Sequence, residues 1–223
     1  MQELLIIGNK SGPAAVNTAM LLQADASQVP LGLPVDRAKP GRVFTKYATP
    51  SGVVTTQAKF GQYSFDCRTG GFEVAGQQKT DLVFAAGIPY TVEFWAYNTA
   101  VDDATWWVYF NAGTSSCFKT FQSTMYLQDN SISITVGGLG TIPLNRWNHV
   151  AIVYNGTTLS LYVNGTRVSN HASNGGWSIP GAFARVMGGE GTAKCYMDQF
   201  RISRTARYTG ASFTVPSAPF ILD

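Results

Sequence analysis

Hydrolysis of a glycosidic bond is the first chemistry that the acidic residues of this sequence could serve. Such a site needs two carboxyl groups that flank one bond, about 5 to 10 Å apart. Glu93 is followed by Ala96 and Tyr97 where a partner acid would lie, and the adjacent Asp102 and Asp103 point apart in an extended chain. Because only 13 acidic residues are spread over the 223 positions, the sequence predicts a protein that is not an enzyme.

The histidines and cysteines give no second kind of catalytic or metal site. His149 and His171 have no nearby Ser or Cys in a triad-like motif, and their spacing offers no metal pair. Cys67, Cys117 and Cys195 show no CxxC spacing. His149 lies in a strand-like pattern, where a hydrogen-bonded structural role is far commoner. The odd cysteine count fits folding in a reducing cytosol, with at most one bridge formed later.

Aromatic side chains are better suited to binding, because sugars present apolar faces to stacked rings with polar groups beside them. In the strand-like stretch TWWVYFN, Trp106 and Val108 share one face and Trp107 and Tyr109 the other, so at least one Trp leaves the core. The candidate ligand-binding residues are therefore Trp107, Tyr109 and, in a Gly-rich loop, Trp177. The alternative for the strand aromatics is packing in the core.

Four basic residues crowd a Pro- and Gly-rich segment at 26–52, which we interpret as a long surface loop. Long loops on a compact scaffold are often functional, so the segment is a candidate attachment to partner proteins. The alternative is solvated charge that protects a sheet edge. The candidate partner-binding residues are Arg37, Lys39, Arg42 and Lys46.

Overall charge and hydropathy narrow the class of partner. A net charge of +3 and a pI near 8.8 argue against a dedicated nucleic-acid protein. No stretch of the sequence approaches the length of a membrane span. We therefore expect neither nucleic acid nor a membrane as a partner.

The candidate residues need a scaffold, and the stretch WNHVAIVYNGTTLSLYVNGTRVS from Trp147 to Ser169 indicates which one. It contains Asn155-Gly156 and Asn164-Gly165, each flanked by strand-like alternation. A two-residue type I′ hairpin turn needs positive φ at both central residues, which Asn-Gly adopts at least cost. We therefore predict a three-stranded meander with one turn at each pair.

Counting outward from the two turns gives the register of this meander and its two faces. The predicted pairs are Ile152 with Leu159, Val150 with Leu161, and Leu161 with Val168. The apolar face is then formed by Val150, Ile152, Leu159, Leu161, Val163 and Val168. Such a face must be covered, usually by a second sheet. The predicted fold is an all-β, two-sheet antiparallel β-sandwich of the jelly-roll kind.

Composition and the remaining segments agree with one sandwich domain. The 23 Gly, 10 Pro, 13% aromatic and 13% charged residues suit a turn-rich all-β protein rather than a helical bundle or a disordered chain. Residues 1–17 form an N-terminal arm, residues 18–223 form the sandwich domain, and residues 208–223 are expected to wrap it in extended form. Further strands are predicted at 19–23, 59–67, 81–84, 90–97, 105–111, 118–127, 131–136, 183–187 and 193–203.

Four stretches carry a resemblance to a known family. They are KFGQYSFD at 59–66, YTVEFWAY at 90–97, NRWNHVAIVYNGTTLSLYVNGTRV at 145–168 and CYMDQFRISRTARYTGASFTVPSAPF at 195–220. In order and spacing they resemble the laminin-G-like members of the concanavalin A-like lectin/glucanase superfamily, from about residue 19 onward. The ending RISRTARYTG, followed by F, P and APF, is similar to sandwich modules in tailed-bacteriophage virion proteins. Such modules also occur in bacterial surface and secreted proteins.

The resemblance also raises the question of calcium. Proteins of this kind often hold Ca²⁺ at the sandwich edge, using an Asp in the last strand and backbone oxygens, and the matching position here is Asp198. Calcium takes roughly six to eight oxygen ligands, which one carboxylate and several carbonyls could supply. The alternative is that Asp198 accepts hydrogen bonds from neighbouring backbone amides.

Two functions agree with this resemblance. The first is a non-enzymatic bacteriophage virion protein, a capsid decoration, neck, tail or fibre component whose arm and basic loop attach to other virion proteins or to copies of itself. A chain that begins with its own Met and lacks a signal peptide favours this function. A virion protein made in the host cytoplasm is released when the cell lyses, so it needs no export. The alternative is a carbohydrate-binding, lectin-like module that recognises host surface glycans. Fold alone does not decide between them.

Overall fold

The computed structural model describes most of the chain from Asn17 to Asp223. The described residues are 17–29, 32–48, 52–74, 81–82, 84–85, 87–101, 105–111, 115–122, 124–129, 134–136, 138–173, 183–186 and 194–223. The predictions for the arm before Asn17, for Trp177 and for the side chain of Tyr109 lie outside what is described. Within these ranges, no helix is long and apolar enough to cross a bilayer.

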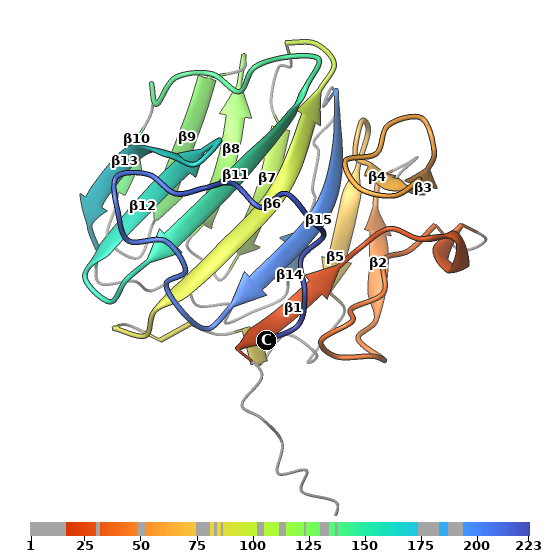
Figure 1. The fold of residues 1–223 in the computed structure, drawn as a ribbon, viewed down its shortest axis with the longest axis horizontal. Coiled ribbons are helices and arrows are strands. Elements are labelled where there is room, and N and C mark those ends of the chain that lie inside the picture. Colours follow the sequence, from red (N-terminus) through yellow and green to blue (C-terminus); the bar gives the residue numbers. More distant parts are fainter. Residues whose placement is uncertain are drawn as a thin grey trace, which may run out of the picture.

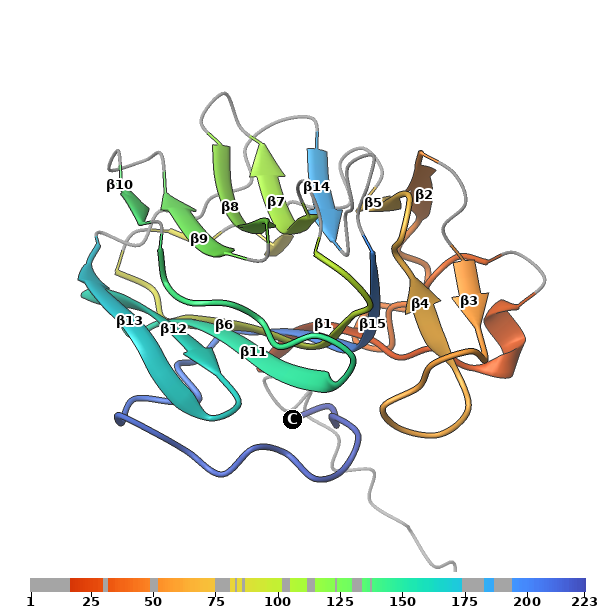
Figure 2. The ribbon, with the colours of Figure 1, turned by 90° about the horizontal axis from the view of Figure 1, so that it is seen from above.

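Two antiparallel sheets stack face to face, which confirms the predicted sandwich (Figures 1 and 2). The larger sheet has the order β13 (Thr166–Ala172), β12 (Thr158–Val163), β11 (Trp147–Tyr154), β6 (Tyr90–Asn98), β15 (Cys195–Ser203), β4 (Ser64–Asp66) and β3 (Gly52–Val54), with β1 (Thr18–Leu22) also paired to β15. The smaller sheet has the order β10 (Ile134–Val136), β9 (Thr124–Asp129), β8 (Ser115–Phe121), β7 (Thr105–Asn111), β14 (Phe183–Val186), β5 (Gly71–Val74) and β2 (Phe44–Tyr47). A short 3₁₀ helix, η1 (Ala26–Gln28), follows β1.

The core lies between the sheets and follows from the alternation of strand side chains. In β6, Val92, Phe94 and Ala96 are fully buried in it, as the alternation predicts. Phe94 stacks on Trp107 of the smaller sheet, with ring centroids 5.6 Å apart. Each fully buried side chain of this size contributes about 1.5–3 kcal/mol through removal from water, so this alternation decides how the sheets face one another.

The second Asn-Gly pair makes the turn that was predicted. Asn164 and Gly165 have φ of 49° and 78°. Val163 pairs with Thr166 directly across them. These are the features of a two-residue type I′ hairpin.

The first Asn-Gly pair makes a different turn. The Asn155 side-chain Oδ1 accepts hydrogen bonds from the N–H groups of Thr157 and Thr158 at 3.0 and 2.8 Å. Tyr154 therefore pairs with Leu159 across a longer loop. An Asn side chain that satisfies the backbone in this way replaces the tight turn with an Asx turn.

This longer loop makes part of the predicted register wrong. Ile152 pairs with Leu161 and Val150 with Val163, two residues beyond the predicted partners. Because side chains alternate with period two, a shift of two keeps the same residues on the core face. The predicted core face of β11 and β12 is therefore correct, although the predicted cross-strand pairs are wrong.

Val168 is an exception to that face. Leu161 pairs with Ser169 and Tyr162 with Arg167, which leaves Val168 as the extra residue of a β-bulge. Its side chain is 38% exposed instead of lying in the core. The bulge, which the alternation alone did not reveal, turns it outward.

Three other segments differ from prediction. The expected surface loop at 26–52 contains β2, whose residues Phe44–Tyr47 pair with β5. The stretch 118–127 is a hairpin of β8 and β9, because the chain reverses at Gln122, which has φ of 48°. The described residues of 81–84 belong to no strand.

The C-terminal tail, residues 204–223, crosses the outer face of the larger sheet in extended form, as predicted (Figures 1 and 2). Its middle is held where Phe213 N–H donates to the Gly165 carbonyl at 2.8 Å. At its end, Thr18 N–H donates to the Asp223 carbonyl at 3.1 Å beside β1. The outer face of the sheet is thereby divided into a covered and an uncovered part.

Candidate functional site

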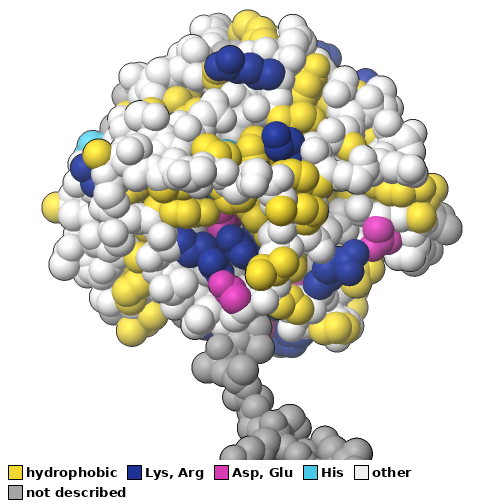
Figure 3. All heavy atoms as spheres, in the orientation of Figure 1, with side chains coloured by type: hydrophobic (Ala, Val, Ile, Leu, Met, Phe, Trp, Pro, Cys, Tyr) yellow, Lys and Arg dark blue, Asp and Glu magenta, His cyan; other side chains and the backbone are white. Residues whose placement is uncertain are grey.

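Cross-strand pairing arranges the outward side chains of the larger sheet in rows across β11, β6 and β15. The rows are Val153–Thr91–Ser203, Ala151–Glu93–Arg201, His149–Trp95–Asp198 and Trp147–Tyr97–Tyr196. The last row continues to Asp66 on β4. The residues of the first three rows are buried, whereas Trp147 and Tyr97 are half-buried. Figure 3 views this face, on which hydrophobic and basic side chains are prominent and acidic ones few.

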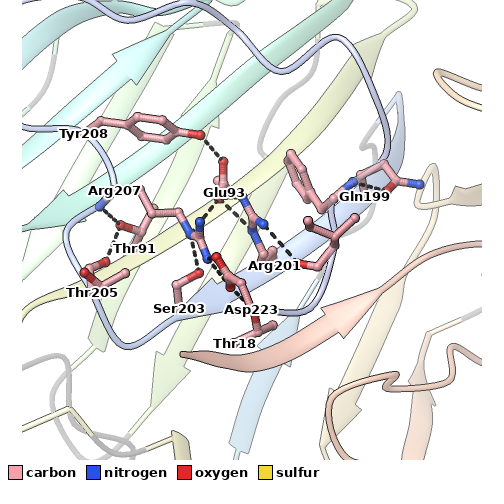
Figure 4. Close-up of polar contacts among 12 residues, drawn as sticks. Thr18, Thr91, Glu93, Gln199, Arg201, Ser203, Thr205, Arg207, Tyr208 and Asp223 are labelled. Atoms are coloured by element: carbon pink, nitrogen blue, oxygen red, sulfur yellow. Dashed lines mark hydrogen bonds and ion pairs between the residues drawn. The ribbon is translucent and has the colours of Figure 1, made fainter. Parts of the chain in front are cut away.

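Glu93 lies at the centre of a polar network beneath the tail (Figure 4). Its Oε1 accepts hydrogen bonds from Arg201 Nη2 and Nε at 2.7 and 2.9 Å. Its Oε2 accepts one from the Tyr208 hydroxyl at 2.8 Å and lies 3.1 Å from His149 Nε2. Arg207 Nε is 3.6 Å from Oε1. The strand supplies the acid, and the tail supplies two of its partners.

The electrostatics of the network keep Glu93 ionised. Burial by itself raises the pKa of Glu93, but the hydrogen bond from His149 and the charge of Arg201 outweigh burial and hold that pKa below its usual value. Burial and the neighbouring Glu93 raise the pKa of the Tyr208 hydroxyl, which stays protonated and donates. Glu93 is 0% exposed. The network therefore joins the tail to the sheet through a buried, ionised acid.

We call the last row, Trp147–Tyr97–Tyr196, the aromatic row. Its Trp147 and Tyr97 are half-buried, whereas Tyr196 is buried. The ring centroids of Trp147 and Tyr97 are 5.5 Å apart, and those of Tyr97 and Tyr196 are 6.2 Å apart. Tyr196 is 4% exposed, and the Arg68 guanidinium lies 5.1 Å from its ring centroid. Half-buried rings with polar groups beside them are the surface on which a sugar can stack.

A cleft of about 240 Å³ opens beside the aromatic row. Its residues Thr99, Lys194 and Arg68 each lie two positions along the chain from a member of the Tyr97–Tyr196–Asp66 row, just beyond the ends of β6, β15 and β4. Thr99 N–H donates to the Lys194 carbonyl at 2.7 Å, which continues the ladder. The cleft is lined by Asp66, Arg68, Thr69, Thr99 and Lys194.

Asp198 does not fit the calcium site that the resemblance implies. Its Oδ2 accepts hydrogen bonds from the N–H groups of Lys59 and Phe60, both at 3.1 Å, and its Oδ1 accepts one from Gln199 at 3.2 Å. Both oxygens thus face donors, whereas calcium needs further oxygens. Burial raises the pKa of Asp198 to about 6. No group of three His, Cys, Asp or Glu side chains among the described residues could hold a metal. Asp198 fastens the loop at 57–61 to β15.

Trp107 is a core residue, so the prediction that it offers a binding surface is wrong. It is the extra residue of a β-bulge, because Trp106 pairs with Lys119 and Val108 with Phe118. The bulge turns both Trp107 and Val108 inward, and Trp107 is 1% exposed. Strict alternation, on which the prediction depended, fails at such a bulge.

The four basic candidates separate into two kinds. Arg42 has a fully buried side chain, whose Nε donates to Asp36 at 2.7 Å and Nη2 to Asp81 at 2.9 Å. It is a structural residue, which makes its prediction as a partner contact wrong. Arg37, Lys39 and Lys46 are exposed and stay available to a partner.

Most of this site is not evident from the sequence. None of Tyr97, Trp147, Tyr196 and Arg68 is among the candidate ligand-binding residues that the sequence suggests. The Asn-Gly turns do not say that β11 pairs with β6 and that β6 pairs with β15. The one available signal was the alternation of YTVEFWAY, which puts Tyr97 on the outer face.

Comparison with known proteins agrees with this architecture. The family model of the concanavalin A-like lectin/glucanases superfamily matches residues 73–209. The chain belongs to this superfamily. No curated protein matches the chain by sequence.

Solved structures of the same fold include binding domains of larger proteins. The binding domain of Paraclostridial Mosquitocidal Protein 1 is similar with a TM-score of 0.63 and 14% identity over 86% of this chain and 50% of that one. A structure of botulinum neurotoxin type C, whose cell entry is described as dependent upon interaction with two ganglioside molecules, gives 0.62 and 10% over 86% and 49%. The chain thus spans about half the length of these two.

In a third similar structure, the match extends over almost the whole length of the other chain. Domain 4 of AbnA, a GH43 extracellular arabinanase from Geobacillus stearothermophilus, in complex with arabinotriose, has a TM-score of 0.61 and 14% identity over 86% of this chain and 94% of that one. At these identities the similarity shows the fold alone. These three are toxin binding domains and an arabinanase domain rather than virion proteins.

Proposed function

We propose that this protein is a non-catalytic carbohydrate-binding module whose sugar lies on the aromatic row. The observation that carries the proposal is the half-buried Trp147–Tyr97 pair beside a polar cleft, on a face whose neighbouring rows are covered by the tail and by the loop at 57–61. A pyranose ring offers C–H groups to such rings and hydroxyls to the polar groups at their side. A similar domain crystallised with arabinotriose makes a glycan the natural first ligand to test.

The absence of catalysis is part of the proposal. Glycoside hydrolysis needs two carboxyl groups that both reach one bond. Of the acids on this face, Glu93 and Asp198 are buried with all their oxygens bonded inside the protein, and Asp66 is paired with Arg68. A reducing-end assay on any bound glycan is expected to show no cleavage, and cleavage would overturn this part.

The binding part is tested by a glycan array followed by calorimetry on the glycans retained. Tyr97→Ala and Trp147→Ala should each weaken binding about tenfold or more, equivalent to about 1.4 kcal/mol. Tyr126→Ala is the matched control, since Tyr126 is a half-buried tyrosine on β9 of the smaller sheet. An array without a retained glycan, or equal losses for Tyr97→Ala and Tyr126→Ala, would contradict the proposal.

The virion hypothesis stays a prediction, together with its subunit partners and location. Of its attachment residues, Arg37, Lys39 and Lys46 are exposed, and Arg42 is buried. Its test is removal of residues 1–17, which should abolish incorporation into a particle while any sugar binding is unchanged. A carbohydrate-binding module can also serve within a virion, so the two functions are compatible.

A further inference from the structure

The cleft beside the aromatic row carries more positive than negative charge. Arg68 and Lys194 each contribute one positive charge and Asp66 one negative charge, which leaves a net charge of one positive (two minus one). Of the other two lining residues, Thr99 already donates its hydroxyl to the Lys194 carbonyl at 3.0 Å, whereas Thr69 has a hydroxyl without a partner among the described residues. An anionic group therefore meets attraction and hydrogen-bond donors in the same place.

Arg68 is held in position but keeps donors for a ligand. Its Nε and Nη2 donate to Asp66 at 3.0 and 2.7 Å, which fixes the plane of the guanidinium. Its side chain is 47% exposed, and Nη1 makes no hydrogen bond within the described part of the chain. A guanidinium has five N–H donors in a rigid fork, so those beyond Asp66 remain for a planar or tetrahedral oxyanion.

Two more groups in the cleft could form a hydrogen bond or an ion pair with a ligand. The Thr69 hydroxyl is buried and has no hydrogen-bond partner among the described residues. Buried polar groups are nearly always bonded, so an unbonded one at the wall of a cleft indicates where a ligand atom or water belongs. Lys194 is exposed and pairs with no acid among the described residues.

We propose that the cleft binds the acidic group, a carboxylate or a sulfate ester, of a sugar whose ring lies on the aromatic row. This inference rests on the proposed carbohydrate binding and names its ligand class. The two parts are contiguous, because the Arg68 guanidinium lies over Tyr196 while it lines the cleft. A free anion would use the cleft alone, whereas an acidic sugar uses the cleft and the aromatic row together.

The test is a nuclear magnetic resonance titration of the full chain with four probes. D-glucuronate and D-glucose 6-sulfate should shift the backbone amides of Thr69, Thr99 and Lys194 and also the indole N–H of Trp147. D-glucose, which has no acidic group for the cleft, should still shift the Trp147 indole N–H but bind about fivefold more weakly, which is the size of one exposed charge contact. Free sulfate should shift the cleft amides and leave the Trp147 indole unchanged.

Variants of Lys194 test whether its positive charge, and not a change in the fold, accounts for the binding of acidic probes. Lys194→Met should weaken the acidic probes about fivefold and leave D-glucose unchanged, while Lys194→Arg restores them. Lys46→Met removes an exposed lysine of β2 on the smaller sheet and should change nothing. The difference in affinity between the acidic probes and D-glucose should also become smaller as the salt concentration is raised, because exposed charges are screened.

Each other outcome overturns the inference. Equal binding of D-glucose and D-glucuronate would mean that the cleft does not select charge, although carbohydrate binding would stand. Acidic sugars that act no differently from free sulfate would mean an adventitious ion only. Acidic probes that leave the cleft amides unshifted would remove the inference, and the glycan array then decides separately on the proposed function.

Discussion

The outer face of the larger sheet contains two regions that are built from the same strands and differ in what covers them. In the covered region, Arg201 and the tail residue Tyr208 donate hydrogen bonds to Glu93 (Figure 4), which also lies 3.1 Å from His149. Four positions further along β6, Tyr97 carries no such cover and lies beside an open cleft. The same alternation thus places a structural acid and a candidate binding residue on one face. Whether the tail covers a residue, and not the type of the residue, decides between a structural role and a binding role.

The largest expected effect is on the covered region. Glu93→Gln should lower the free energy of unfolding by about 3–5 kcal/mol, because it leaves Arg201 buried without its counter-charge. Urea denaturation at neutral pH measures it. Glu73→Gln is the matched control, a half-buried partner of Arg185 on the smaller sheet at 2.8 Å. Equal costs for the two variants would show that burial beneath the tail is not what makes Glu93 important.

The second effect is a pH dependence at Asp198, whose pKa is raised from 3.8 to about 6 in the folded protein. The folded state then binds this proton more tightly than the unfolded state does. The stability contributed by the group is therefore fully present below pH 3.8 and is lost as the pH rises through about 6. The rise in pKa corresponds to about 3 kcal/mol.

Asp198→Asn removes this titration. Between about pH 4 and pH 7, the unfolding free energy of the variant relative to the unmodified protein should rise by about 3 kcal/mol. The comparison is made by urea denaturation across that range, with the half-buried Asp25→Asn as control. A constant difference between the two curves would contradict the raised pKa.

A third and smaller effect concerns how the tail lies on the sheet. Gly165→Ala should cost about 2 kcal/mol, since an added Cβ at φ of +78° would overlap the Phe213 carbonyl oxygen. Gly41→Ala is the control, because Gly41 has φ of +97° with nothing within 4 Å of the added Cβ. Hydrogen exchange at the Phe213 amide should quicken in the first variant only. Equal behaviour of the two would mean that backbone strain, and not tail contact, accounts for the cost.

The smallest expected change in stability is in the uncovered region. Tyr97→Ala should lower the free energy of unfolding by about 1 kcal/mol, the value of its contacts with Trp147 and Tyr196. Thermal unfolding monitored by circular dichroism measures it. A loss of unfolding free energy as large as that of Glu93→Gln would mean that Tyr97 mainly stabilises the fold. The contrast between the two regions would then be removed.

The fold was predictable because its signals are local. The alternation in β6 and the meander with its Asn-Gly pairs were enough to predict two stacked antiparallel sheets and the face of each strand that enters the core. Bulges were not predictable in the same way. Trp107 and Val168 each sit at an extra residue in one strand, and one added residue reverses the face of the later residues in that strand without changing the local composition.

The amino-acid sequence by itself determined the sandwich class, the inward face of β6 and the turn at Asn164-Gly165, since each depends on neighbours a few residues apart. Only the tertiary structure decided which outward residues are covered and which stay open. Tyr97 meets Trp147 and Tyr196 across strands that lie about 50 and 100 positions away in the chain. The tail reaches Glu93 from more than 100 positions away. No local pattern carries such distances, because pairing order and cover are set by the packing of the whole chain.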